Sequence, residues 1–256
     1  MQLPVLRRLI IPDPGMTLLD LDLSAADAQV VAWASDDTLL KRQLRSGTDL
    51  YMETATGLWS ECAHVPRSRR KNCVHSADYG ASYKTIGDKY IGDRYVAKRW
   101  LNKWFTLHPR VRAWQRQVEF SLQSSRTIAN PWGFRRVYTD RLDYILPQAL
   151  AWIGQSTVAI TINKILLRVD HAHEHEDLPI ELLLQDHDNL VMQCPTNQLN
   201  EAVPRLLELA KVPIPFPDPL IISASLKTSE RSWADVEPVF LHEFKLKELS
   251  VTFPTG

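Results

Sequence analysis

The chain has 256 residues, with 30 Lys or Arg against 30 Asp or Glu and a hydrophobic content of 45%. This composition is typical of a globular protein with one large domain or two small ones, and it excludes a disordered chain. No run reaches the roughly 18 consecutive apolar residues of a membrane span, and the first residues lack a signal peptide's apolar segment, so we expect an intracellular, soluble protein with no membrane partner.

The zero net charge hides an uneven distribution. Residues 67–136 hold sixteen Lys or Arg and four acids, whereas the rest of the chain holds fourteen and twenty-six. A basic block in a neutral chain predicts a polyanion partner, such as nucleic acid or a triphosphate. The alternative is a solvated helical surface, but the size of the asymmetry favours the polyanion.

The first half of the chain predicts one strand and then helices. Residues 16–24 set apolar residues beside alternating acids and predict a strand with Asp20 and Asp22 on one face. The expected helices are residues 25–44 with an interruption near 35–37, Arg67 to about Tyr79 after Pro66, and 88–126 with a break at His108 and Pro109.

The second half mixes hairpins and helices. Residues 129–138 predict a hairpin, and 143–170 predict a long apolar helix with a break near Pro147. Apolar runs at 180–185 and 189–194 predict a hairpin whose polar tip is His187 and Asp188. A helix at about 197–211 and a strand at 220–226 complete the prediction.

Two acids mark the ends of predicted strands. If the strands that carry Asp22 and Asp188 are neighbours, their carboxylates can hold hard divalent cations such as Mg²⁺. Two such ions about 4 Å apart activate a hydroxyl and steady a leaving pyrophosphate. Arg67, Lys71 and His75 share one helical face and would meet a triphosphate. The alternative is that both aspartates are turn and cap residues, as most surface aspartates are.

Several segments resemble the motifs of one family. Three stand in order along the chain, namely LLDLDLSAADAQVVAWASDDTLLK (18–41), RSRRKNCVHSADYG (67–80) and LLLQDHDNLVMQCP (182–195). Four further segments resemble parts of the same family: the connecting segments at 105–114 and 127–138, a Gln-Ser-Thr at 155–157 and a closing segment at 219–233. The set resembles family A DNA polymerases, the group of bacterial DNA polymerase I and many phage replicases, from about residue 6 to about residue 233.

The resemblance implies a two-metal site and a triphosphate site. Asp22 and Asp188 become the carboxylates for two Mg²⁺ ions, and the Leu23 carbonyl completes one ion. Arg67 and Lys71 hold the incoming nucleotide, and Lys71 is also a candidate proton donor to pyrophosphate.

The remaining implied contacts are to the sugar, the template and the primer. His75 and Asp27 lie at the nucleotide sugar, and Tyr79 sits by the templating position. Gly80 lets the backbone pass closely beside DNA. Gln155, Gln185 and His187 contact the primer terminus and the minor groove.

Several positions depart from the family pattern. Asp27 replaces the usual Glu of the sugar gate, and His75 replaces the usual Phe or Tyr. Asn189 replaces a usual Glu, which leaves one charge fewer near the metals. Pro147 and Ala151 replace a frequent Arg and Asn, so some primer and template contacts are missing.

The resemblance implies an α+β fold in which an antiparallel palm sheet carries an inserted, mostly helical fingers subdomain. The expected parts are palm over 1–36, fingers over 37–145 and palm over 146–256. The chain starts 21 residues before Asp22, so we expect the thumb and the exonuclease domain to be absent. A second polypeptide carrying the thumb and the upstream palm is therefore an expected partner.

The expected function is template-directed transfer of a deoxynucleotide to a primer 3′ end by a split or truncated DNA polymerase, with primer–template DNA and dNTP as partners. The expected location is the cytoplasm, including a host's cytoplasm for a phage protein. Two alternatives remain: a structural half-subunit that is inert alone, and a non-catalytic nucleic-acid binder.

His171 and His175 share a helix face and could bind zinc, although a solvated helix end, which includes His173, is the favoured interpretation.

Overall fold

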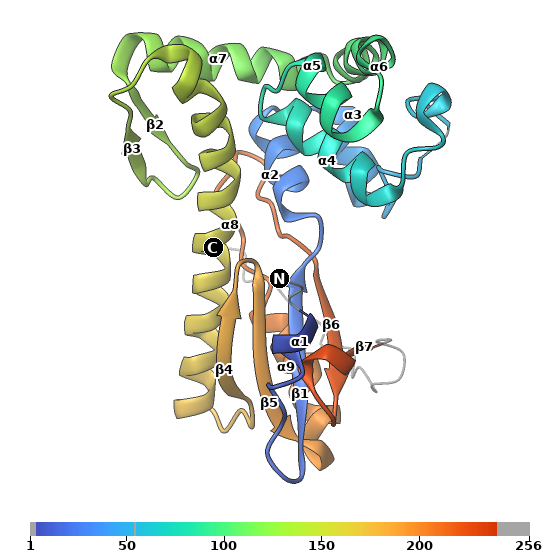
Figure 1. The fold of residues 1–256 in the computed structure, drawn as a ribbon. Coiled ribbons are helices and arrows are strands. Elements are labelled where there is room, and N and C mark those ends of the chain that lie inside the picture. Colours follow the sequence, from blue (N-terminus) through green and yellow to red (C-terminus); the bar gives the residue numbers. More distant parts are fainter. Residues whose placement is uncertain (1–3, 54, 240–256) are drawn as a thin grey trace. The chain divides into compact units, whose positions relative to one another are not determined.

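The structure is a computed structural model that describes residues 4–53 and 55–239, and its contacts divide the chain into two compact units. Unit 1 consists of Met1–Ser24, Thr161–Val212 and Ile221–Gly256. Unit 2 consists of Ala25–Ile160 and Pro213–Leu220. The chain thus leaves unit 1 after its first strand and returns to it within a long helix, α8 (Leu142–His175) (Figure 1).

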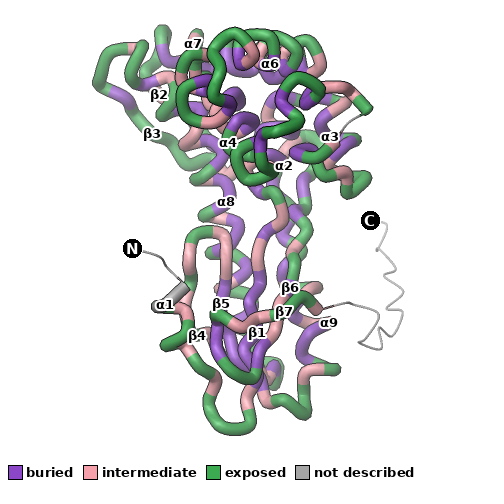
Figure 2. Tube along the Cα trace, turned by 45° about the vertical axis from the view of Figure 1, so that its right-hand side comes forward, coloured by how far each residue is buried: buried purple, intermediate pink, exposed green. Residues whose placement is uncertain are grey.

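Unit 1 is built on a five-stranded antiparallel sheet in the order β4-β5-β1-β6-β7. Its strands are β1 (Met16–Leu23), β4 (Glu181–Asp186), β5 (Asn189–Pro195), β6 (Ala224–Ser229) and β7 (Glu237–Pro238). Because β1 pairs on both sides, with β5 and with β6, nearly all of its residues are buried (Figure 2). The predicted α+β class with an antiparallel sheet is confirmed.

Short helical segments complete unit 1. They are α1 (Pro4–Arg7), η3 (Thr196–Gln198), α9 (Leu199–Leu209), η4 (Trp233–Asp235) and the second part of α8. Leu18, Val191 and Trp233 form a buried cluster against which Ile10 and Val236 pack. The cluster joins segments from both ends of the described chain to the central strands.

Unit 2 is mostly helical. Its elements are α2 (Ala26–Ala34), α3 (Thr38–Arg45), η1 (Ser60–Cys62), α4 (Arg67–Asp78), α5 (Tyr83–Ile86), η2 (Gly87–Ile91), α6 (Arg94–Leu107), α7 (Pro109–Ser125), β2 (Thr127–Ala129), β3 (Arg135–Val137) and the first part of α8. Local signals set several starts: Asp37 and Asp93 cap α3 and α6 with their side chains, and Pro109 opens α7.

An aromatic ladder fills the core of unit 2. The ring centroids of Trp59 and Trp100 lie 5.2 Å apart, those of Trp100 and Trp104 lie 6.1 Å apart, and His108 lies 4.3 Å from Trp104. His108 in turn shares a 3.1 Å hydrogen bond, through Nδ1, with Asp37 Oδ1, and both side chains are almost fully buried. Trp100 and Trp104 therefore serve the core and do not stack on a ligand from the surface.

The predicted elements are largely confirmed, with two corrections. The predicted break near Pro147 is wrong, because α8 runs through this residue from Leu142. Pro147 lies close to the start of α8, where its missing N–H costs the helix a single bond to the carbonyl four residues earlier. The closing strand begins at Ala224 and not at Leu220, because β1 ends at Leu23, the partner of Ala224, and offers earlier residues no neighbour. The boundaries predicted after residues 36 and 145 remain predictions.

Helix α8 is the one described helix long and apolar enough to cross a membrane by length and composition. Half of its most apolar stretch is buried within the protein, and the core helix of a soluble protein meets the same criteria. In unit 1 its buried side chains include Ile162, Ile165 and Val169.

Candidate functional site

The structure brings Asp22 and Asp188 to the same end of the unit 1 sheet. Asp22 is the cross-strand partner of Asn189, and the Leu23 N–H donates to the Asp188 carbonyl at 3.3 Å. A two-residue turn joins β4 to β5, and its first residue, His187, takes a left-handed φ of 56°. Because this turn is tight, Asp188 stands at the tip beside the end of β1. Both aspartates are half-buried.

Asp20 lies two residues before Asp22 and is 1% exposed. Its Oδ2 accepts a 2.9 Å hydrogen bond from Trp233 Nε1, and its Oδ1 accepts one from Asn189 Nδ2. Sequence reasoning did not link these three residues. The available signal was an acid within the apolar run LLDLDL, because a buried carboxylate requires donors from elsewhere in the fold.

The other predicted site residues of unit 1 lie near the hairpin. Gln185 is exposed near the end of β4, and the His187 side chain is 92% exposed at the tip. Asp186 forms an ion pair with Arg7 at 3.6 Å. Gln185 and His187 are exposed to solvent, so they are available to a macromolecular partner.

In unit 2, α4 carries a row of predicted nucleotide-binding residues spaced by four. Arg67 is exposed and its Nε lies 2.6 Å from Asp49 Oδ2, with the guanidinium 5.3 Å from the Tyr51 ring centroid. Lys71 is exposed one turn later. The N-terminal half of α4 therefore presents two cations to solvent, one of them already paired with a carboxylate.

The C-terminal half of α4 meets Asp27 of α2. His75 Nδ1 lies 3.5 Å from Asp27 Oδ2, and His75 Nε2 lies 3.5 Å from the Tyr51 hydroxyl. The Tyr79 hydroxyl is buried near Asp27, and no hydrogen bond of good geometry reaches it among the described residues. Burial and the nearby Asp27 raise the pKa of Tyr79, and burial raises the pKa of Tyr51 to about 12. Both phenols therefore stay protonated at neutral pH.

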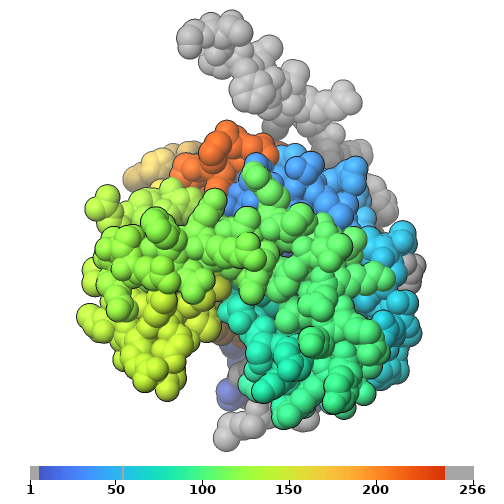
Figure 3. Space-filling model, turned by 90° about the horizontal axis from the view of Figure 1, so that it is seen from above, coloured from blue at the N-terminus to red at the C-terminus, as the bar shows by residue number. Residues whose placement is uncertain are grey.

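A cavity of about 280 Å³ adjoins this end of α4. Its lining residues come from α4, the segment after it and α8, and they are Asn72, His75, Ser76, Tyr79, Ala81, Tyr90 and Pro147. Gly80 follows Tyr79 with φ +78°, and a Cβ there would lie 3.3 Å from Leu150. Gln155 is exposed further along α8. In Figure 3, α6 and α7 (green) form part of the face of unit 2 that is turned toward the viewer, beside the teal atoms of α4 and α5 and the yellow-green start of α8.

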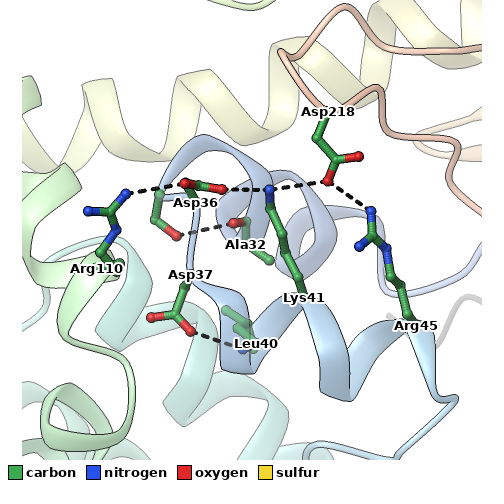
Figure 4. A network of polar contacts seen from close by, with 9 residues as sticks. Ala32, Asp36, Asp37, Leu40, Lys41, Arg45, Arg110 and Asp218 are labelled. Carbon is green, nitrogen blue, oxygen red and sulfur yellow. Dashed lines mark hydrogen bonds and ion pairs between the residues drawn. The ribbon is translucent and has the colours of Figure 1, made fainter.

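A larger hollow of about 590 Å³ in unit 2 contains none of the predicted site residues. An ion-pair network crosses its rim, in which Lys41 Nζ lies 2.8 Å from Asp36 and 3.4 Å from Asp218 (Figure 4). Arg45 lies 2.8 Å from Asp218, and Arg110 lies 3.2 Å from Asp36. The network ties the proline-rich segment 213–220 to α3.

Within residues 4–53 and 55–239, no group of three or more His, Cys, Asp or Glu side chains is arranged to hold a metal ion. The His171 and His175 rings lie 4.8 Å apart, and both side chains are more than half exposed, while His173 Nδ1 pairs with the Leu178 carbonyl at 3.1 Å. The role of these histidines stays a prediction.

Comparisons with known proteins agree on one family. A sequence profile described as DNA polymerase family A matches residues 2–231. The chain is 27% identical over 252 residues to a thermostable DNA polymerase I of Thermus filiformis, which covers 91% of the chain and 29% of that protein. It is 25% identical over 235 residues to a DNA polymerase of Mycobacterium phage D29, which covers 90% of the chain and 37% of that protein.

The fold is also similar to that of a solved structure. The POL domain of Pol1 from M. smegmatis, in complex with DNA primer-template and dNTP, matches with a TM-score of 0.77 at 22% identity. The match covers 90% of this chain and 42% of that one. The chain spans only about a third of the length of the curated relatives described above.

Proposed function

The chain belongs to DNA polymerase family A, and on this basis we propose that it catalyses DNA-directed DNA synthesis in the cytoplasm. In the reaction, the 3′ oxygen of a primer bonds to the α-phosphorus of a dNTP. The bond to pyrophosphate breaks, and the hydroxyl proton is released. The observation that carries the proposal is the joint placement of Asp22 and Asp188 at one end of the unit 1 sheet.

The unit 1 residues fit Mg²⁺, which prefers hard oxygen ligands. The donors are the Asp22 and Asp188 carboxylates and the Leu23 carbonyl, and the nearby Asn189 Oδ1 is a buried acceptor with no partner among the described residues. Two bound Mg²⁺ ions would polarise the phosphate and stabilise charge on the attacking and leaving oxygens. The residues present therefore suit a two-ion site, and the remaining ligands come from water and the triphosphate.

The cations of α4 bind the triphosphate. Arg67, whose Nε donates one hydrogen bond to Asp49, exchanges Asp49 for phosphate, because a planar guanidinium can hold a phosphate with two parallel hydrogen bonds. Lys71 adds a compact charge and donates a proton from Nζ to the leaving pyrophosphate. The surrounding basic block lowers the cost of gathering phosphates there.

Asp27, His75 and Tyr79 bind the nucleotide's sugar and the templating position. Asp27 is shorter than the Glu usual in the family, but its contact with His75 holds the carboxylate at the α4 face. Gly80 permits close backbone approach at its positive φ, and Gln155, Gln185 and His187 reach the primer and minor groove from exposed positions.

A specific observation favours the half-subunit alternative. Leu6, Leu9 and Ile11 are 54%, 74% and 63% exposed within six residues of unit 1. Three large apolar side chains exposed so close together in the chain suit contact with another polypeptide. We propose that this segment contacts the part of the polymerase that supplies thumb and upstream palm, on a partner chain.

Primer extension by the purified chain tests the catalytic proposal. A labelled primer–template, Mg²⁺ and dNTPs are incubated with the wild-type chain, with Asp188→Ala, and with Glu230→Ala, which removes an exposed acid from the same unit. We expect Asp188→Ala to abolish extension and Glu230→Ala to retain it. Extension by Asp188→Ala would refute the site assignment.

Two further measurements separate the alternatives. Lys71→Ala should slow extension most at low dNTP, and an unchanged rate there would contradict its role. If neither the wild-type chain nor Asp188→Ala extends the primer, the half-subunit is supported, whereas salt-sensitive DNA binding is what the non-catalytic binder predicts. DNA binding unaffected by loss of both Asp22 and Asp188, again without extension, favours the non-catalytic binder.

A further inference from the structure

Asp20 and Asn189 lie next to the predicted metal-binding residues Asp22, Leu23 and Asp188 in unit 1. We propose that Asp20 orients the side-chain amide of Asn189 so that Asn189 Oδ1 serves a divalent cation held by Asp22 and Asp188, as a ligand or as acceptor for the cation's water. The inference rests on the proposed function, since it assumes a cation at those two carboxylates. Asn189 then contacts the cation or its water, and Asp20 is a positioning residue.

The position of Asn189 follows from strand pairing. It is the cross-strand partner of Asp22 and directly follows Asp188 in the chain. Side chains of directly opposed residues lie on the same face, with Cβ atoms about 5 Å apart. Asp20 and Asp22 also share a face, because β-strand side chains alternate. The Asn189 amide therefore lies on the same sheet face as Asp20 and Asp22, at the end of the sheet where Asp188 stands.

Asp20 fixes the orientation of the Asn189 side-chain amide. A carboxylate only accepts hydrogen bonds, and Asp20 is buried with Trp233 Nε1 on one oxygen and Asn189 Nδ2 on the other. If the amide were flipped, two acceptor oxygens would face each other in a buried place. The hydrogen-bond network thus assigns Nδ2 to Asp20 and turns Oδ1 away from it.

The Asn189 Oδ1 atom is buried and has no hydrogen-bond partner within the described parts of the chain. A buried acceptor without a partner is destabilising, and such groups in native proteins commonly serve an ion or a water. An amide oxygen on the same face as the Asp22 carboxylate is a suitable neutral ligand for a hard cation. The same interactions pin the β4–β5 turn to β1, which gives the competing, purely structural explanation.

Cation binding by the full chain, without DNA or dNTP, separates the two explanations. Free Mn²⁺ is titrated by electron paramagnetic resonance against the wild-type chain, Asn189→Ala and Asn200→Ala, which truncates an exposed Asn of the same unit. Removing a group that tunes a metal site typically costs 10- to 100-fold in affinity. We expect about a tenfold loss for Asn189→Ala and none for Asn200→Ala.

An exchange of the two side chains guards against a folding defect. Asp20→Asn alone sets two amides against each other, and we expect weaker Mn²⁺ binding and a lower melting temperature. Adding Asn189→Asp restores an amide-to-carboxylate pair with the carboxylate on the metal side. The double variant should recover the melting temperature and bind Mn²⁺ at least as tightly as the wild type.

Each contrary result points to a different failure. Wild-type Mn²⁺ affinity in both Asn189→Ala and Asp20→Asn would overturn this inference and leave the pair a structural pin. Unchanged affinity in Asp22→Ala and Asp188→Ala would overturn the metal site of the proposed function itself.

Discussion

Asp20 in unit 1 and Asp78 in unit 2 are both almost fully buried, at 1% and 2% exposure, yet their surroundings differ. Asp20 has a donor on each oxygen, from Trp233 and Asn189. Asp78 Oδ1 meets no donor among the described residues. Burial raises the pKa of Asp78 well above its ordinary value, and the nearby Trp104 indole offsets this only in part.

The difference shows that burial alone does not set the role of a carboxylate. Two donors let Asp20 serve as a fixed anchor next to Asn189, whereas the raised pKa of Asp78 favours its protonated form, which avoids the cost of a buried charge. The first arrangement fixes geometry beside the predicted metal site. The second makes the stability of unit 2 depend on pH.

Replacing Asp20 should have the largest effect on the free energy of unfolding. Asp20→Ala leaves two buried N–H groups without an acceptor, so we expect a loss of about 3 kcal/mol in the free energy of unfolding. Urea unfolding measures the loss, and hydrogen exchange of β1 and β5 localises it. Asp22→Ala, at a half-buried position on the same strand, is the control and should cost less. A loss for Asp20→Ala no larger than for this control would contradict the anchor.

Replacing Asp78, the buried acid whose Oδ1 meets no donor among the described residues, should change how the free energy of unfolding depends on pH. Above the ordinary Asp pKa of 3.8, unfolding releases the Asp78 proton that the folded state retains. The free energy of unfolding therefore falls as pH rises, by up to about 1.4 kcal/mol per pH unit, until the pH reaches the raised folded pKa. Asp78→Asn should abolish this fall and make the chain more stable than wild type at neutral pH.

Thermal unfolding of both chains at several pH values checks this prediction. The difference in melting temperature between Asp78→Asn and wild type should grow as pH rises above the ordinary Asp pKa of 3.8, until the pH reaches the raised folded pKa. Because other groups titrate equally in both chains, only the difference is compared. A constant difference over this range would show that Asp78 is ionised in the folded state.

An exposed, paired acid should give the smallest effect. Asp218 accepts from Lys41 and Arg45, whose hydrogen bonds outweigh partial burial and lower its pKa. Its contribution is present above the ordinary pKa and is lost as pH falls, the opposite sign from Asp78. Asp218→Asn should shift the melting temperature by at most about 2 °C. The shift should vanish in high salt, and a larger, salt-independent shift would mean that the segment 213–220 depends on this one residue.

The sequence by itself determined most of the helices and strands, because their signals are local. Pro66, Pro109 and the acids at 36–37 mark helix ends wherever the chain is placed. The alternation around Asp22 and the polar tip at Asp188 gave the two strands that carry the predicted carboxylates. The residue roles at α4 came from motif resemblance and remain predictions.

Only the tertiary structure decided which side chains meet. Trp233 lies 213 residues from Asp20 along the chain, and no local pattern links an indole to that carboxylate. The start of β6 was misplaced because it depends on where β1 ends, and the contrast between Asp20 and Asp78 depends on donors supplied by distant segments. Periodicity states which face a residue occupies, whereas hydrogen bonding and burial depend on the partner that the fold brings to that face.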